Sequence, residues 1–272
     1  MKILVLDGGG VFGNVQATIL QRIDVLEKFD CFVGTSIGSA IVAAIVSGNH
    51  LKVDQQFFHT WMPVIFHGTP RTYWPFNSKY SDKGLNKALM DTFRGTFLRD
   101  VQKPLFVTAA NVGSRTLKVF SPQTDNSWLL WEVIRAATAA ETYFPSWKGY
   151  ADGGVFANNP SMVAIAAACR MLGAKLEDVE VLSIGTGQKP ARGGRGPVSI
   201  FGWGSWLINA LLEGASDAMH DYFVNSLPIK RYTRIQFAAH ADWKMDSVAD
   251  MMKSQRAWAQ DVEKARGVVK AF

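Results

Sequence analysis

Two short apolar segments near the start of the sequence each lead into glycine and then into a helical pattern. The first is KILVL at residues 2–6 and the second is CFV at residues 31–33, and both have the composition of buried strands. Apolar side chains at helical spacing follow in segments 14–28 and 36–48. Because strands alternate with helices, the sequence predicts a parallel sheet with helices packed against it.

The rest of the chain continues with further strands and helices. Gly113 separates two strand-like segments, as in a hairpin. Residues 150–160, which read YADGGVFANNP, are expected to form a loop because of their glycines, asparagines and proline. The other expected strands are 104–112, 116–121, 179–187 and 231–237, and the other expected helices are 85–93, 127–140, 161–172, 205–219 and 246–265.

The length and composition suit a single domain. Of the 272 residues, 48% are hydrophobic and 19% are charged, which is enough apolar material for a large core and excludes a disordered chain. Residues 50–100 lack clear periodicity over much of their length and are expected to form a loop-rich lobe. Residues 191–204 are rich in glycine and are expected to form a mobile loop. We therefore expect one domain over residues 1–272, with its main motifs in residues 1–187.

The formal net charge of +6 favours contact with anionic surfaces such as phospholipid headgroups. No dense block of lysine and arginine with interleaved aromatic residues occurs, so nucleic-acid binding is not expected. Cys31 and Cys169 lie in apolar segments without metal-type partners at short spacing, and we expect reduced core thiols. Asp7 interrupts the first apolar run, and no run reaches the roughly 18 residues of a membrane span. These features predict a cytoplasmic protein.

The segment GTSIG at 34–38 carries a candidate nucleophile, Ser36. Glycines two residues before and after a serine let the chain turn sharply from a strand into a helix, which exposes the serine hydroxyl. The positive end of the following helix favours a developing oxyanion. Gly34 and Gly38 are therefore the expected glycines of a nucleophile elbow. The alternative is a serine that caps a helix after a glycine turn.

A serine nucleophile needs a base, and Asp152 is the candidate we favour. It is followed by Gly153 and Gly154, which allow another loop to approach closely. An unperturbed aspartate has a pKa of about 4 and is a weak base, but partial burial raises its basicity. The alternative is an Asp-Gly turn. None of the five histidines lies in a segment with a convincing catalytic pattern; they are His50, His59, His67, His220 and His240.

The glycine-rich segment DGGGVFG at 7–13 allows two interpretations. Gly8, Gly10 and Gly13 match the dinucleotide-binding pattern between a strand and a helix. That pattern also needs an acidic residue after the second strand, whereas Asp30 precedes it. The second interpretation is an oxyanion hole, in which the backbone amides of Gly8, Gly9 and Gly10 converge on a carbonyl oxygen. We favour the second interpretation.

Taken in order, these motifs resemble the patatin-like phospholipase family. The resemblance covers about residues 1–187 and rests on the glycine motif at 7–13, GTSIG at 34–38, DGGVFANNP at 152–160, RAATAAETYFP at 135–145 and SIGTG at 183–187. It implies an α/β fold, a three-layer α/β/α sandwich with a mostly parallel central sheet. It also implies hydrolysis of lipid acyl esters by a Ser36–Asp152 dyad, through an acyl-enzyme intermediate, with no metal and no cofactor. Gly8, Gly9 and Gly10, with Gly13, would form the oxyanion hole.

Two residues depart from the family pattern. Phe12 stands in the first motif where the family often has arginine or lysine, which removes a cation and leaves the headgroup preference open. Glu141 stands where proline is frequent. Neither departure changes the expected dyad.

A lipid hydrolase must also reach its substrate. The aromatic residues of segments 198–212 and 73–76 are candidate contacts with a phospholipid membrane, which predicts peripheral membrane association; the alternative is that they belong to the core. A small-ester hydrolase or an acyltransferase of the same fold remains an alternative function. So do a non-catalytic regulator and a membrane-degrading effector that needs an activating partner. A homo-oligomer is also compatible with the sequence.

Overall fold

The computed structural model describes residues 1–21, 23–49, 55–67, 77–190 and 216–272, together with residues 199, 202–203, 206–207 and 210. In this part of the chain, seven strands form one mixed sheet in the order β4-β3-β2-β1-β6-β7, with β5 paired to β3. The pairs among β3, β2, β1, β6 and β7 are parallel. The strands are β1 (Lys2–Leu6), β2 (Cys31–Thr35), β3 (Leu105–Asn111), β4 (Thr116–Phe120), β5 (Tyr150–Asp152), β6 (Glu180–Ile184) and β7 (Arg231–Ile235).

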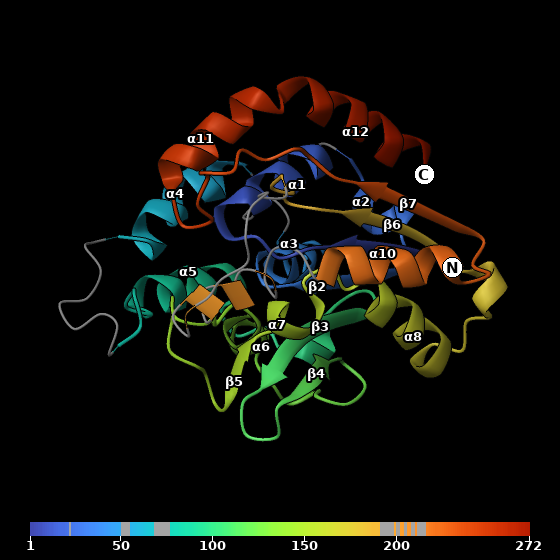
Figure 1. Cartoon of the computed structure of the whole chain (residues 1–272). Coiled ribbons are helices and arrows are strands. Elements are labelled where there is room, and N and C mark those ends of the chain that lie inside the picture. Colours follow the sequence, from blue (N-terminus) through green and yellow to red (C-terminus); the bar gives the residue numbers. More distant parts are fainter. Residues whose placement is uncertain are drawn as a thin grey trace.

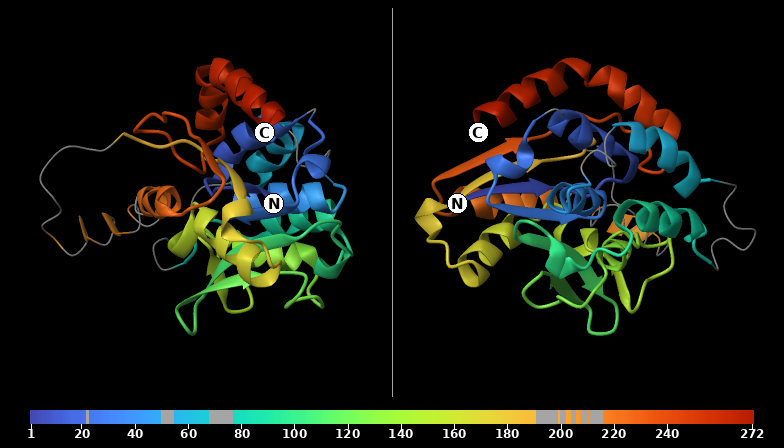
Figure 2. Two further views of the ribbon diagram at one scale, coloured as in Figure 1. Left: turned by 90° about the vertical axis from the view of Figure 1, so that its right-hand side faces the viewer. Right: turned by 180° about the vertical axis from the view of Figure 1, so that it is seen from behind.

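Helices cover both faces of the sheet, as Figures 1 and 2 show. Strand side chains alternate between the faces: Leu4 and Leu6 pack into the larger core, whereas Ile3 and Val5 pack into the smaller one. The smaller core is closed by α8 (Ser161–Met171) and α10 (Ser216–Ser226). The larger core is closed by α1 (Gly13–Leu20), α3 (Ile37–Val46), α4 (Gln55–Ile65), α5 (Lys83–Phe93), α6 (Leu130–Ala137), α11 (Val248–Ala257) and α12 (Ala259–Ala271). The three-layer α/β/α prediction is confirmed.

Strand β5 replaces β2 along one edge of β3. β2 pairs with β3 as far as Thr35 opposite Thr108. The next residue of β3, Ala109, is already paired with Asp152 of β5. Because β2 leaves the sheet at Ser36, the end of β5 lies where β2 would have continued. The register of three strands therefore brings two distant segments of the sequence together.

Several predicted elements differ from the structure. The expected helix over 14–28 is interrupted, because the backbone of Gln21 is extended (ψ 135°), and α2 (Val25–Lys28) follows separately. The expected loop over 150–160 contains β5 and the short helix α7 (Gly154–Ala157). The expected final helix is divided at Trp258, and its second part reaches Ala271.

The segment expected to be a loop-rich lobe contributes two helices to the larger core. In α4 the side chains of Phe58, Met62 and Ile65 are buried at helical spacing, although Pro63 lies inside the helix. The predicted helix over 85–93 is confirmed as α5. Residues 50–54 and 68–76 lie outside the described residues.

Most of the expected glycine-rich loop and of the expected helix over 205–219 also lies outside the described residues. Among the residues that the structure describes, no helix is long and apolar enough to cross a membrane.

Candidate active site

Ser36 lies in a strained turn between β2 and α3. Its backbone has φ 51° and ψ −125°, a conformation that a non-glycine residue rarely adopts. The flanking glycines let the turn pack closely: a Cβ atom at Gly34 would lie 2.6 Å from the backbone of Ser39, and one at Gly38 would overlap the carbonyl oxygen of Leu6. This is the elbow geometry that exposes a serine hydroxyl above the start of a helix.

The end of β5 brings Asp152 to the serine. Ser36 Oγ donates a hydrogen bond of 2.6 Å to Asp152 Oδ2, across 116 residues of sequence. The other carboxylate oxygen accepts a hydrogen bond of 2.8 Å from the backbone N–H of Gly154, and Gly153 begins the turn into α7. Asp152 is 3% exposed. Its carboxylate is thus held between one hydroxyl and one backbone amide.

Burial changes the protonation of two carboxyl groups here. It raises the pKa of Asp152 to about 6, although the hydrogen bonds from Ser36 and Gly154 act in the opposite direction. Burial, with the charge of Asp152 as a second cause, raises the pKa of Glu141 to about 8. Both carboxyl oxygens of Glu141 are buried without a hydrogen-bond partner among the described residues. The residue that departs from the family pattern is therefore a second buried acid close to the dyad.

The glycine-rich segment differs from the expected oxyanion hole at two of its four glycines. The N–H of Gly8 already donates to the carbonyl oxygen of Asn158 at 3.2 Å. The N–H of Gly13 is directed at the carbonyl oxygen of Gly10 within the helical turn. Within the described residues, the amides of Gly9 and Gly10 have no hydrogen-bond acceptor, and both residues line the cavity in front of Ser36. The candidate amide donors are reduced to these two.

Two contacts fix this segment in place. Asp7, which precedes it, accepts two hydrogen bonds from the guanidinium group of Arg234 on β7, at 3.0 and 2.6 Å. Thr186 Oγ1 donates to the carbonyl oxygen of Gly8 at 2.6 Å. Arg234 was not singled out from the sequence, because only the pairing of β6 with β7 brings it next to the end of β1.

Phe12 packs in an aromatic cluster rather than near the dyad. Its ring is stacked on Trp243 at a centroid distance of 6.0 Å and meets Trp258 edge-on at 6.0 Å. The carbonyl oxygen of Met245, in the same C-terminal segment, accepts a hydrogen bond from Val11 N–H at 2.9 Å. The C-terminal segment therefore lies directly on the glycine-rich segment.

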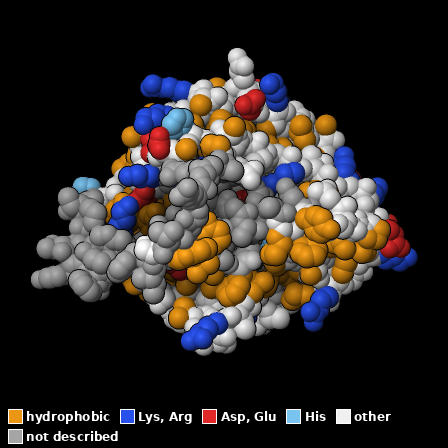
Figure 3. Space-filling model, viewed as in Figure 1, with side chains coloured by type: hydrophobic (Ala, Val, Ile, Leu, Met, Phe, Trp, Pro, Cys, Tyr) orange, Lys and Arg blue, Asp and Glu red, His pale blue; other side chains and the backbone are white. Residues whose placement is uncertain are grey.

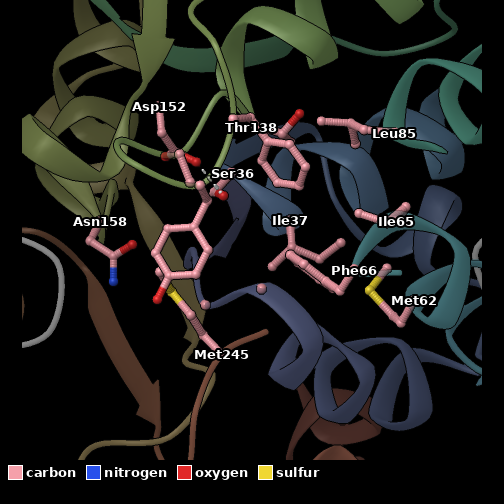
Figure 4. Close-up of a pocket in the computed structure, with 15 residues that line it drawn as sticks. Ser36, Ile37, Met62, Ile65, Phe66, Leu85, Thr138, Asp152, Asn158 and Met245 are labelled. Carbon is pink, nitrogen blue, oxygen red and sulfur yellow. Dashed lines mark hydrogen bonds between the residues drawn. The ribbon is translucent and has the colours of Figure 1, made fainter. Parts of the chain in front are cut away.

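The cavity in front of Ser36 is polar at one end and apolar at the other (Figure 4). Asp152, Thr138 and Asn158 lie near Ser36, with Met245 on the same side, and the side chains of Met62, Ile65 and Leu85 lie at the other end. The free space is about 80 Å³, several times the roughly 10–15 Å³ that one water molecule needs. The apolar lining consists of Ile37, Met62, Ile65, Phe66, Leu85, Phe144 and Met245, with Ala140 and Tyr143 beside them.

The cavity contains residues that sequence reasoning missed. Asn158 and Tyr143 belong to motifs that we quoted, so their positions carried a signal, but Met62 and Met245 carried none. The four described histidines do not line the cavity: His220 is buried in α10, and the others are His59, His67 and His240. His50 lies outside the described residues. In the described part of the chain, no group of three or more His, Cys, Asp or Glu side chains is arranged to hold a metal ion.

Comparison with known proteins shows the family of this chain. The family model described as patatin-like phospholipase matches residues 4–165. Protein teg of Priestia megaterium is 30% identical over 75% of this chain and 67% of its own length. A cGAMP-activated phospholipase of Pseudomonas aeruginosa is 27% identical over 90% of this chain and 80% of its own length. An intracellular phospholipase A2 of Caenorhabditis elegans is 28% identical over 70% of this chain and 20% of its own length. The chain therefore belongs to the patatin-like phospholipase family.

Proposed function

We propose that this protein hydrolyses the carboxylic ester bonds of phospholipids, with Ser36 as the nucleophile and Asp152 as its base. Membership of the family supports lipid acyl hydrolase activity in general. The observation that carries the finer proposal is the hydrogen bond of 2.6 Å from Ser36 Oγ to Asp152 Oδ2, at the polar end of a largely apolar cavity.

The proposed reaction has two steps. Ser36 Oγ attacks the ester carbonyl carbon while its proton moves to Asp152, and the carbonyl oxygen becomes an oxyanion that the amides of Gly9 and Gly10 stabilise. The bond to the leaving alcohol then breaks, and Asp152 returns the proton to that alcohol. In the second step Asp152 takes a proton from water, the resulting hydroxide attacks the acyl-enzyme, and the fatty acid leaves as Ser36 regains its proton. With a pKa of about 6, Asp152 is mostly ionised at pH 7 and available as a base.

The two ends of the cavity would hold different parts of the substrate. The apolar end between α4 and α5, which includes Met62, Ile65 and Leu85, suits an acyl chain. Each buried CH₂ group contributes about 0.8 kcal/mol. The end with Asn158 and Thr138 suits the polar leaving group. Such a substrate is drawn from a membrane surface, so the enzyme would associate with the bilayer while active.

The test is fatty-acid release from defined phospholipid vesicles by wild type, Ser36→Ala and Asp152→Asn. We expect each variant to lose roughly 10²–10⁴-fold or more in rate, with an unchanged circular dichroism spectrum. Full activity in either folded variant would refute the dyad. Activity of wild type on short soluble esters but not on vesicles would instead favour the small-ester hydrolase.

The second candidate function is a phospholipase that needs an activating ligand. A relative is named a cGAMP-activated phospholipase. In this chain the C-terminal segment lies on the proposed amide donors, and the carbonyl oxygen of Met245 is so close to Gly10 that a Cβ atom there would overlap it. A ligand that shifts this segment would change the position of the Gly9 and Gly10 amides. The vesicle assay is therefore run with and without a cyclic dinucleotide, and equal rates would exclude this activator.

A further inference from the structure

Every exposed aromatic residue in the described part of the chain belongs to one C-terminal helix, to the residues just before it, or to the short helix next to it. The exposed aromatic residues are Phe156 (38%), Trp203 (50%), Trp206 (51%), Tyr222 (73%) and Phe223 (49%). Leu207 and Met219 add two aliphatic side chains, at 52% and 49%. We call these seven residues the aromatic face.

Helix α10 carries the centre of the aromatic face. Its inner side is buried, with Val224 at 0% and His220 at 5% exposure. Its outer side presents Met219, Tyr222 and Phe223, where a surface helix of a globular protein normally has polar residues. The rings of Tyr222 and Phe223 contact each other edge-on at 5.8 Å. The outer side of this helix therefore carries three exposed apolar side chains, with the polar Asn225 and Ser226 beside them.

The aromatic face borders the wall of the active site. Phe156 lies on α7, between Asp152 and Asn158, and both of these residues line the cavity. α7 packs beside α10. Trp203 and Trp206 contact each other edge-on at 5.4 Å. The described parts of segment 202–210, which carries them, lie on the same side of the molecule as α10 (Figure 2, left). Figure 3 shows the apolar side chains gathered on this side.

We propose that the aromatic face docks on a phospholipid bilayer and sets the active site against it. This rests on the proposed function, because Asp152 and Asn158, on either side of α7, line the cavity that would take the acyl chain. The chemistry fits a bilayer interface: tryptophan and tyrosine place an apolar ring among the acyl chains and a polar N–H or O–H among the headgroups. The exposed methionine, leucine and phenylalanine side chains supply apolar area beside them.

The experiment measures binding to phosphatidylcholine vesicles by flotation, in the Ser36→Ala background so that the lipid stays intact. The test variant adds Tyr222→Ser and Phe223→Ser. The matched control adds Leu117→Ser and Met171→Ser, which remove two exposed hydrophobic residues, at 38% and 37% exposure, from β4 and α8. We expect the vesicle partition coefficient to fall at least tenfold in the test variant, about 1.4 kcal/mol, and to stay within twofold in the control.

Activity is then measured with Ser36 restored. The Tyr222→Ser, Phe223→Ser variant should hydrolyse a short, monomeric, water-soluble ester at the wild-type rate and phospholipid vesicles at least tenfold more slowly. Unchanged flotation of this variant overturns the proposal. The proposal is also overturned if wild type is a dimer that the two substitutions dissociate and if wild type does not float with vesicles. In that case the aromatic face would bind a second copy of the chain. Loss of the proposed function itself is a separate result, in which wild type hydrolyses neither ester although it binds vesicles.

Discussion

Asp7 directly follows β1 and Asp152 ends β5 of the same sheet. The two are about equally buried, at 2% and 3% exposure, but their partners differ. Asp7 accepts two hydrogen bonds from a guanidinium group that is itself mostly buried. Among the described residues, Asp152 accepts hydrogen bonds from a hydroxyl and an amide, neither of which carries a charge. The first carboxylate is neutralised by its partner, whereas the second retains an uncompensated charge.

This difference separates a structural carboxylate from a candidate catalytic one. Pairing with a fixed cation favours the ionised form and makes a carboxylate a poor proton acceptor. Burial without a cation has the opposite effect and raises the pKa of Asp152 to about 6. Glu141 extends the series, because its carboxyl oxygens have no partner in the described part of the chain and its pKa rises to about 8. Burial thus raises the pKa of both Asp152 and Glu141, whereas Asp7 is in contact with a guanidinium group.

The largest expected effect comes from removing the charge of Asp7. In Asp7→Asn the buried guanidinium group of Arg234 loses the carboxylate that accepts two of its hydrogen bonds, and we expect the free energy of unfolding to fall by about 3–5 kcal/mol. The double variant Asp7→Asn, Arg234→Gln should recover part of that loss. Urea denaturation of the three proteins measures it. A loss below about 1 kcal/mol in the single variant would mean that the pair is not what distinguishes Asp7 from Asp152.

The pH dependence of hydrolysis tests the unpaired carboxylate. Asp152 must be ionised to accept the serine proton, so kcat/KM on a soluble ester should fall about tenfold per pH unit below pH 6. With an ordinary aspartate pKa of about 4, the fall would begin two units lower. Since a soluble ester needs no vesicle, membrane binding does not contribute to this profile. A rate that stays constant down to pH 4.5 would contradict the raised pKa.

The smallest expected effect concerns Glu141. Because its pKa is higher in the folded than in the unfolded protein, wild type should lose stability as the pH rises from about 4.5 to 8, where burial of the ionised form becomes a cost. Glu141→Gln cannot ionise and should therefore gain stability relative to wild type over that range, with a rise in Tm of roughly 2–4 °C for each kcal/mol. The exposed Glu177→Gln is the control. Equal Tm differences at pH 5 and pH 8.5 would show that Glu141 does not titrate in this way.

What could be predicted from the sequence is local. The turn at Ser36 depends on Gly34 and Gly38, which are two residues away, and the strands and helices beside it have their own periodicity. Helix α4 contains Pro63 and was not predicted, although its buried side chains are at helical spacing. The three residues of β5 have no strand pattern of their own, and they form a strand because they pair with β3.

What could not be predicted depends on contacts between distant segments. The carbonyl oxygen of Asn158 accepts a hydrogen bond from the amide of Gly8, across 150 residues of sequence. This removes one of the expected oxyanion donors. Arg234 reaches Asp7 across 227 residues. Glu141 was noted only as a departure from a family pattern. Its meaning follows from the packing that buries it near Asp152.

The replacement of β2 by β5 along the edge of β3 has a consequence for biosynthesis. A nascent chain that has emerged only as far as Ser36 has the proposed nucleophile but not the proposed base, since Asp152 is synthesised 116 residues later. Contacts of such large sequence separation form late in folding. The proposed catalytic pair therefore requires β2, β3 and β5 to be in place, and a chain that stalls before residue 152 lacks the carboxylate that would accept the serine proton.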